Sequence, residues 1–266
     1  MMEVVNIYLR AGSHPILTLL DCSKAFDLCR FSDIFSGLLD RGLPPIIVRV
    51  LTFVYEQQHA WVRWGDSKSD LFNILNGTTQ GSVLSAAVFT VYMEPLLKQL
   101  RALGLGCHVA GLFMGVLGYC DDLALLAPSR DAMQAMLQVC EGFAARVGLV
   151  FSTDPVPAKS KSKCILMCGK RTGLTKPVPL VLNGKSLPWV ASATHLGYEV
   201  NETGTMEMDA RVKRAKFIAD SVEVRESFSF ASPVEVLRAT KVYCSAMYGS
   251  MLWSMEIQWG DGRDDV

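Results

Sequence analysis

Two adjacent aspartates, Asp121 and Asp122, lie between apolar residues in the stretch "GYCDDLALLAPS", residues 118–129. Asp is common in turns, and the apolar residues on either side predict two short buried strands, so a plain acidic turn is one interpretation. Adjacent carboxylates repel each other, however, and a hairpin turn more often carries Asn-Gly or Asp-Gly. A site for a metal ion or for phosphate transfer is therefore the other interpretation.

A third carboxylate, Asp21, lies near the end of "PILTLLDCS", residues 15–23, which predicts a buried strand. In an antiparallel sheet this strand can lie beside the hairpin that carries Asp121 and Asp122, and the three carboxylates would then share one edge. Carboxylates that close together imply a cation. Mg²⁺ prefers oxygen ligands and binds through carboxylates together with substrate phosphates. Two such ions about 3.5–4 Å apart can support phosphoryl transfer.

A polar strip bounded by glycines, "NGTTQGSVLSAAVF" at residues 76–89, leads into a predicted helix. Glycine lets a backbone approach a ligand closely, the Gln80 amide can donate and accept, and a helix start presents free N–H groups to anions. An ordinary loop capped by Thr or Ser explains the same residues. The strip alone therefore does not define a site.

Positive charge is concentrated locally although 26 basic and 26 acidic residues give a net charge of zero. Residues 155–176 contain no acid, and a second basic cluster falls within 211–216 on a predicted helix. Either cluster alone is explained by a solvated surface, and zero net charge is unusual for a nucleic-acid-binding protein. The basic residues of the first run are Lys159, Lys161, Lys163, Lys170, Arg171 and Lys176.

The order of predicted elements indicates an α+β fold with a mostly antiparallel sheet, helices on one face, and a separate helical tail beginning near residue 200. Asn183-Gly184 between two apolar runs predicts a hairpin. The expected helices cover residues 31–40, 45–57, 81–101, 130–147, 206–227 and 233–249, and the further expected strands cover 59–66, 71–77 and 194–200.

The sequence also predicts where the chain resides. No apolar run approaches the roughly 18 residues of a membrane span, and the start lacks the basic and apolar regions of a signal peptide. The eight cysteines form no C-x-x-C pair, and Cys164 and Cys168 with His195 make at most a partial metal set. We therefore expect reduced thiols in an intracellular protein of the nucleus or cytoplasm, neither secreted nor bound to a membrane.

Three stretches in chain order, "LDCSKAFD", "TTQGSVLS" and "YCDD", resemble motifs A, B and C of reverse transcriptases, especially those of non-LTR (LINE-type) retrotransposons. "GLVFSTDPVPAKSKSKCILM" resembles the motif D region, and "THLGYEV" resembles motif E, a hairpin. The resemblance covers about residues 15–255. It implies a polymerase palm-like antiparallel sheet with helices on one face over 1–200, and a helical partial thumb over 201–266.

The resemblance implies an RNA-directed DNA polymerase that transfers nucleotides to a primer 3′-hydroxyl with two metal ions. Its cofactor would be Mg²⁺ or Mn²⁺, and its partners an RNA template, a DNA primer and deoxynucleoside triphosphates. Asp21 matches the motif A metal ligand, with the carbonyl of Cys22 as a backbone ligand. Asp121 and Asp122 match the motif C pair, and Asp121 is expected to be the more direct ligand.

Other positions match residues that contact nucleotides in this family. Phe26 lies at the steric-gate position, where an aromatic ring excludes the ribose 2′-hydroxyl, although core packing would explain the same residue. Gln80 and Gly81 match the motif B residues that contact the incoming nucleotide and the template. Asp27 has no such role, and we interpret it as a helix N-cap.

Two further roles rest on motifs D and E. A motif D lysine would protonate the pyrophosphate leaving group; Lys163 is favoured, and Lys159 and Lys161 compete for the role. The hairpin would hold the primer end through His195, Leu196 and Gly197.

The chain departs from the family pattern in two places. It begins 20 residues before Asp21, with only Arg10 as a basic residue where the family carries a fingers segment, and Ala86 replaces the usual Pro. A non-catalytic truncated remnant that at most binds nucleic acid or protein is therefore the alternative, and we expect little primer extension by the chain alone. A nucleotidyl cyclase is disfavoured because its Gly-Gly-(Asp/Glu)-Glu-Phe turn is absent.

Overall fold

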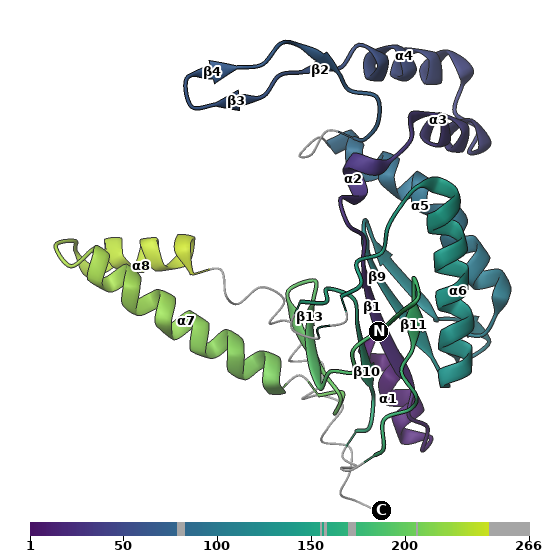
Figure 1. The fold of residues 1–266 in the computed structure, drawn as a ribbon. Helices are drawn as coiled ribbons and strands as arrows, with labels where there is room; N and C mark the ends of the chain where they lie inside the picture. The colour runs from purple at the N-terminus through teal and green to yellow at the C-terminus, as the bar shows by residue number, and fades with distance from the viewer. Residues whose placement is uncertain (79–82, 155, 157–158, 170–173, 206, 245–266) are drawn as a thin grey trace, which may run out of the picture. The chain divides into compact units, whose positions relative to one another are not determined.

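The structure is a computed structural model, which describes residues 1–266 except 79–82, 155, 157–158, 170–173, 206 and 245–266 (Figure 1). The chain forms two compact units. The first consists of Met1–Met167 together with Gly173–Val190, and the second of Cys168–Thr172 together with Ala191–Val266. Within the described residues, no helix is both long enough and apolar enough to cross a membrane.

The first unit is built on a four-stranded antiparallel sheet with strand order β10-β1-β9-β8. The strands are β1 (Ile16–Asp21), β8 (Val116–Tyr119), β9 (Asp122–Ala127) and β10 (Lys163–Leu166). The predicted α+β class with antiparallel pairing is confirmed. Leu17 and Thr18 point to opposite faces of the sheet, yet both are fully buried, so both faces of the central strand are covered.

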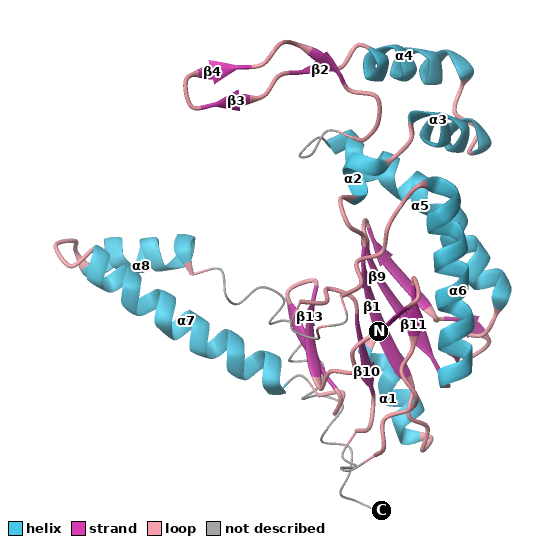
Figure 2. Cartoon of the chain, in the orientation of Figure 1, coloured by secondary structure: helices cyan, strands magenta, loops and turns pink. Residues whose placement is uncertain are grey.

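Two helices, α5 (Val83–Leu103) and α6 (Arg130–Val147), contact each other and cover one face of this sheet (Figure 2). Phe89 of α5 and Phe143 of α6 belong to the same buried cluster as Leu125 of β9. The ends of α6 lie where the sequence predicts them. The hydroxyl of Ser129 accepts a hydrogen bond from the N–H of Ala132 at 3.2 Å, and the helix ends before Gly148, which has φ 77°.

Four shorter helices belong to the first part of the chain: α1 (Met2–Arg10), α2 (Ala25–Leu28), α3 (Phe31–Asp40) and α4 (Pro45–Glu56). The expected helices at 31–40 and 45–57 are confirmed, whereas α1 was not predicted. The N-cap position of α2 is Lys24, with φ 49°, and Asp27 lies inside the helix. The interpretation of Asp27 as an N-cap is therefore wrong, because the chain enters α2 three residues earlier than the pattern indicated.

Between α4 and α5 the chain forms an arm of two successive short ladders. The outer hairpin pairs β3 (Arg63–Trp64) with β4 (Ser67–Lys68), and the inner ladder pairs β2 (His59–Ala60) with β5 (Phe72–Asn73). The two strand regions expected at 59–66 and 71–77 are thus present, with an additional turn inside the first. Another short hairpin joins β6 (His108–Val109) to β7 (Leu112–Phe113).

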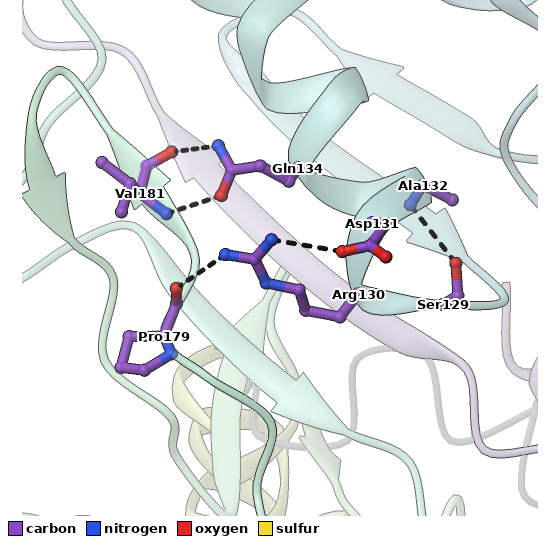
Figure 3. A network of polar contacts seen from close by, with 7 residues as sticks. All are labelled: Ser129, Arg130, Asp131, Ala132, Gln134, Pro179 and Val181. Carbon is purple, nitrogen blue, oxygen red and sulfur yellow. Dashed lines mark hydrogen bonds and ion pairs between the residues drawn. The ribbon is translucent and has the colours of Figure 1, made fainter.

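The predicted Asn183-Gly184 hairpin is confirmed: it joins β11 (Val181–Leu182) to β12 (Lys185–Ser186), with φ of 52° and 69° at the two turn residues. Side chains of α6 hold it (Figure 3). The Gln134 amide donates to the carbonyl of Val181 and accepts from its N–H, both at 2.9 Å. Arg130 donates to the carbonyl of Pro179 at 3.4 Å.

The second unit contains a hairpin and two helices. The hairpin pairs β13 (Ser192–His195) with β14 (Tyr198–Asn201), because Leu196 and Gly197 take φ of 49° and 77° and reverse the chain. The single strand expected at 194–200 from the apolar pattern is therefore wrong, and the hairpin that the motif E resemblance implied is confirmed. The helices are α7 (Glu207–Ser227) and α8 (Pro233–Tyr243). The end expected for the last helix, near residue 249, lies outside the described residues.

A buried ion pair within α7 contacts this hairpin. Lys213 Nζ lies 2.9 Å from Asp209 Oδ2 and 4.0 Å from the centre of the Tyr198 ring. The other oxygen of Asp209 accepts a hydrogen bond from the N–H of Glu199 at 3.0 Å. Both side chains of the ion pair are buried, so the contact fixes the start of α7 against β14.

Candidate active site

The carboxylates predicted from the sequence lie at one end of the central strands. Asp21 is the last residue of β1, Asp122 is the first residue of β9, and the two are direct cross-strand partners. Directly opposite residues of an antiparallel pair project to the same face, with Cβ atoms about 4.5–5.5 Å apart. The predicted pairing of the two strands is confirmed, and it brings these two carboxylates together.

Asp121 lies in the two-residue turn that joins β8 to β9, after Cys120. Cys120 has φ 53°, a left-handed conformation that costs a residue with a side chain about 1–2 kcal/mol relative to its usual conformations. Tyr119, the last residue of β8, is largely exposed. The "YCDD" stretch is thus a tight, strained hairpin end and not a solvated loop.

The charges of Asp21 and Asp121 both act on the thiol of Cys22. Burial raises the pKa of the Cys22 thiol most, and the negative charges of Asp121 and Asp21 raise it further. Burial, followed by Asp121 and Asp122, likewise raises the pKa of Cys120. Asp121 therefore acts on both thiols, whereas Asp21 acts on Cys22 and Asp122 acts on Cys120.

The three carboxylates do not form a ready-made cluster. In the described part of the chain, no group of three or more His, Cys, Asp or Glu side chains is placed to hold one metal ion. Asp21 and Asp122 form a pair, while Asp121 occupies the adjoining turn. Neighbouring carboxylates repel each other, so without a cation nothing draws the Asp121 carboxylate toward the pair.

The surroundings of Asp21 nevertheless suit a divalent cation. Its Oδ2 atom is buried and accepts no hydrogen bond. Lys161 Nζ forms an ion pair with this oxygen at 3.6 Å, and the backbone N–H of Asp21 donates to Ser162 Oγ at 3.2 Å. A buried carboxylate oxygen that accepts no hydrogen bond, opposite a second carboxylate on the next strand, is the kind of ligand that Mg²⁺ prefers, and Lys161 would move aside when the cation binds.

The lysines of the basic run differ in position. Lys161 contacts Asp21, whereas Lys163 lies in β10 opposite Leu19 and is half-buried, and Lys159 is exposed. Sequence reasoning favoured Lys163, and the structure brings Lys161 to the carboxylates. Lys161 and Ser162 were not assigned contacts with Asp21 from the sequence. The acid-free run at 155–176 was the one signal that pointed to this loop.

Phe26 lies on α2, directly after β1 and Cys22. Its ring stacks on Phe89 of α5 with ring centres 4.7 Å apart, and it is only partly buried. Part of the ring thus packs against the core and part is accessible. The geometry is compatible with both interpretations made from the sequence.

The strip that follows in the motif B region docks on α2. The N–H of Gly77 donates to the carbonyl of Cys29, and the N–H of Thr78 donates to the carbonyl of Phe26, both at 2.8 Å. Gly77 has φ 95°, and a Cβ there would lie 3.0 Å from backbone atoms of Asp27 and Phe26. Gln80 and Gly81 lie outside the described residues.

The residues predicted to hold the primer form the β13–β14 hairpin of the second unit. His195 ends β13, and Leu196 and Gly197 form the turn, with Leu196 partly exposed. The described contacts join this hairpin to α7 through Asp209 and Glu199.

Comparison with known proteins assigns the chain to a family. It belongs to the reverse transcriptase (RNA-dependent DNA polymerase) family, whose sequence profile matches residues 2–200. The chain is related to the Pol proteins of non-LTR retrotransposons, as the resemblance of its motifs indicated.

Two relatives illustrate this kinship. The chain is 29% identical over 153 residues to the retrovirus-related Pol polyprotein from the type-2 retrotransposable element R2DM of Drosophila melanogaster. The matched segment covers 56% of the chain and 14% of that protein. The chain is also 24% identical over 201 residues to the retrovirus-related Pol polyprotein from the type-1 retrotransposable element R2 of Nasonia vitripennis. This matched segment covers 74% of the chain and 19% of that protein. The chain thus matches less than a fifth of either relative.

Two telomerases are among the solved structures with a similar fold. Apo telomerase from Candida tropicalis, truncated from its C-terminal domain, has a TM-score of 0.50 at 12% identity and covers 76% of this chain and 37% of that one. Telomerase from Candida albicans, in complex with a fragment of telomeric RNA, has a TM-score of 0.51 at 11% identity and covers 91% and 42%. At these identities the likeness concerns the fold.

Proposed function

We propose that the chain is an RNA-directed DNA polymerase domain of retrotransposon origin, with its palm over residues 1–200 and part of a thumb over 201–266. It would add deoxynucleotides to the 3′-hydroxyl of a DNA primer on an RNA template. The observation that carries the proposal is the direct pairing of Asp21 with Asp122 beside the strained Cys120-Asp121 turn. Family membership supports the same reaction.

Asp21, Asp121 and Asp122, with the carbonyl of Cys22, are the residues that would hold Mg²⁺ or Mn²⁺. When bound, such ions supply positive charge that stabilises the transferring phosphoryl group and its leaving oxygen. The protein's contribution is positioning: β1 and β9 fix the two paired carboxylates on rigid, buried strands.

The lysine beside the carboxylates has a role in this proposal. Lys161 Nζ, 3.6 Å from Asp21, would turn toward the phosphates of a bound nucleotide and donate a proton to the pyrophosphate leaving group. Its largely exposed side chain can make this movement. Lys163 is the second candidate for this role.

Three other regions complete the proposed site. Phe26 would contact the sugar of the incoming nucleotide and disfavour a 2′-hydroxyl. Gln80 and Gly81 would contact the nucleotide and the template. The hairpin turn at His195, Leu196 and Gly197 would hold the end of the primer.

Primer extension on an RNA template tests the proposal. We expect slow extension by the chain that depends on Mg²⁺ or Mn²⁺, and its loss in Asp21→Asn and Asp121→Asn. Asp131→Asn is the matched control, because Asp131 is an exposed carboxylate in the first turn of α6. Binding of Mn²⁺, followed by electron paramagnetic resonance, should weaken in the two site variants and not in the control.

A different set of results would favour the non-catalytic alternative. A chain that binds RNA but shows no extension, and whose Mn²⁺ affinity is unchanged by Asp21→Asn, would be a non-catalytic remnant that binds nucleic acid. Extension that survives Asp121→Asn would exclude the carboxylates from the reaction.

A further inference from the structure

The outer hairpin of the arm, β3–β4, lies at the end of the arm away from α4 (Figure 1), and aromatic side chains at and beside it are exposed. Trp64 is 86% exposed and Trp61 is 45% exposed. A large indole ring left in water gives up the free energy that burial would provide. Exposed rings grouped on one small hairpin indicate a surface that contacts a partner.

The same hairpin carries two positive charges in direct opposition. Arg63 and Lys68 are cross-strand partners, and like charges in such a position destabilise a hairpin. Neither forms an ion pair with a carboxylate in the described part of the chain, although Asp66 and Asp70 lie on the same hairpin. A negatively charged partner would relieve this repulsion.

The local contacts hold these side chains in defined positions. Lys68 Nζ lies 4.4 Å from the centre of the Trp61 ring, and Arg63 Nε donates to the carbonyl of Gly65 at 3.1 Å. Hydrogen bonds between Val62 and Ser69 extend the ladder beyond the paired strands. Side chains alternate along a strand, so Arg63 and Lys68 project to one face and Trp64 to the other.

We propose that the β3–β4 hairpin binds single-stranded nucleic acid. Arg63 and Lys68 contact phosphates on one face of the hairpin, and the strand crosses the hairpin tip so that Trp64, next to the turn, stacks on a base at the other face. Exposed aromatic rings beside basic groups are the combination that binds single strands without regard to sequence, because every base has a face on which a ring can stack. The inference rests on the proposed function, in which the bound strand is the RNA template.

Fluorescence anisotropy with a labelled single-stranded RNA of 12 nucleotides tests the stacking role in the full chain. Loss of one stacked base weakens binding by about 10-fold or more, so we expect this change in Trp64→Ala and near-normal affinity in Trp64→Phe. Leu75→Ala is the matched control: Leu75 is an exposed apolar residue that follows the same arm, and its removal should change affinity by less than about twofold.

Salt dependence tests the phosphate contacts. Each phosphate contact to a single strand contributes about 0.7 to the slope of log affinity against log salt concentration. The double variant Arg63→Ala/Lys68→Ala should therefore lower this slope by about 1.4, whereas Trp64→Ala should leave the slope unchanged.

Two results would overturn the inference. In the first, Trp64→Ala and the double variant bind the RNA as tightly as the unmodified chain. In the second, these variants and Leu75→Ala leave RNA binding intact but abolish self-association in sedimentation experiments, which would make the arm a protein-docking surface.

Primer extension separates this inference from the proposed function. RNA binding that depends on Trp64 in a chain without polymerase activity would support the hairpin's role and refute the polymerase. Extension that depends on Asp21, together with RNA binding that is unchanged in Trp64→Ala, would support the polymerase and refute the hairpin's role.

Discussion

Replacing Gly77 by alanine should destabilise the first unit far more than the same change at Gly12. Both glycines have positive φ, 95° and 79°, so each substitution adds a backbone strain of about 1–2 kcal/mol. A Cβ at Gly12 meets no atom within 4 Å. At Gly77 it meets the Cα and carbonyl oxygen of Asp27 and the carbonyl oxygen of Phe26, each at 3.0 Å. These are backbone atoms, which cannot move aside as a flexible side chain can.

The added crowding at Gly77 should cost about 1–3 kcal/mol beyond the strain, which gives a total of about 2–5 kcal/mol. The free energy of unfolding in urea, measured for Gly12→Ala and Gly77→Ala, checks this difference. Primer extension should also fall in Gly77→Ala, because the hydrogen bonds to Cys29 and Phe26 hold the strip on α2. Equal destabilisation by the two substitutions would refute the close packing of Gly77 against α2.

Three further predictions concern other regions. Lys213→Met removes the charge that offsets buried Asp209, so it should lower the free energy of unfolding of the second unit by about 3 kcal/mol. The control Arg214→Met removes an exposed charge and should cost less than about 0.5 kcal/mol. Equal losses in the two variants, measured by urea unfolding, would contradict this prediction. Burial raises the pKa of Cys140 from 9.0 to about 12, so its stabilising contribution, complete below pH 9, should be lost as the pH rises toward 12. The loss from this thiol is about 1.4 kcal/mol at pH 10. Because other buried thiols, such as Cys29 and Cys164, lose stability over the same range, urea unfolding at pH 8 and 10 should show a loss smaller by this amount in Cys140→Ala than in the unmodified chain; an equal loss in both proteins would exclude the Cys140 thiol as a source. Phe26→Val should admit ribonucleotides in primer extension, whereas unchanged sugar discrimination with a large fall in melting temperature would make Phe26 a core residue.

The elements that the sequence predicted well carry their signals locally. The residues that start and stop α6, Ser129 and Gly148, are directly adjacent to the helix in the sequence, so both ends could be predicted. The Asn183-Gly184 turn is likewise determined by the preference of those two residues for positive φ. Leu196-Gly197 forms a similar turn without such a signal at its first residue, so the apolar pattern predicted a continuous strand there and only the motif E resemblance implied the hairpin.

The candidate site combines local and long-range information. The order of apolar strands was enough to predict that β1 pairs with β9, and hence that Asp21 meets Asp122. Which lysine reaches Asp21 could not be predicted, because Lys161 and Lys163 are two residues apart and only the position where β10 begins separates them. The strain at Cys120 was also invisible, since nothing in a cysteine indicates a left-handed backbone.

The contact between Gln134 and Val181 has a consequence for how this chain behaves at high concentration. A strand at the margin of a sheet offers unpaired peptide groups to which another molecule can add a strand. At Val181 the amide of Gln134 occupies both peptide groups, as a neighbouring strand would (Figure 3). The Gln134 side chain thus takes both hydrogen bonds that an added strand would form at Val181, and it protects this edge from aggregation without adding a strand to the fold.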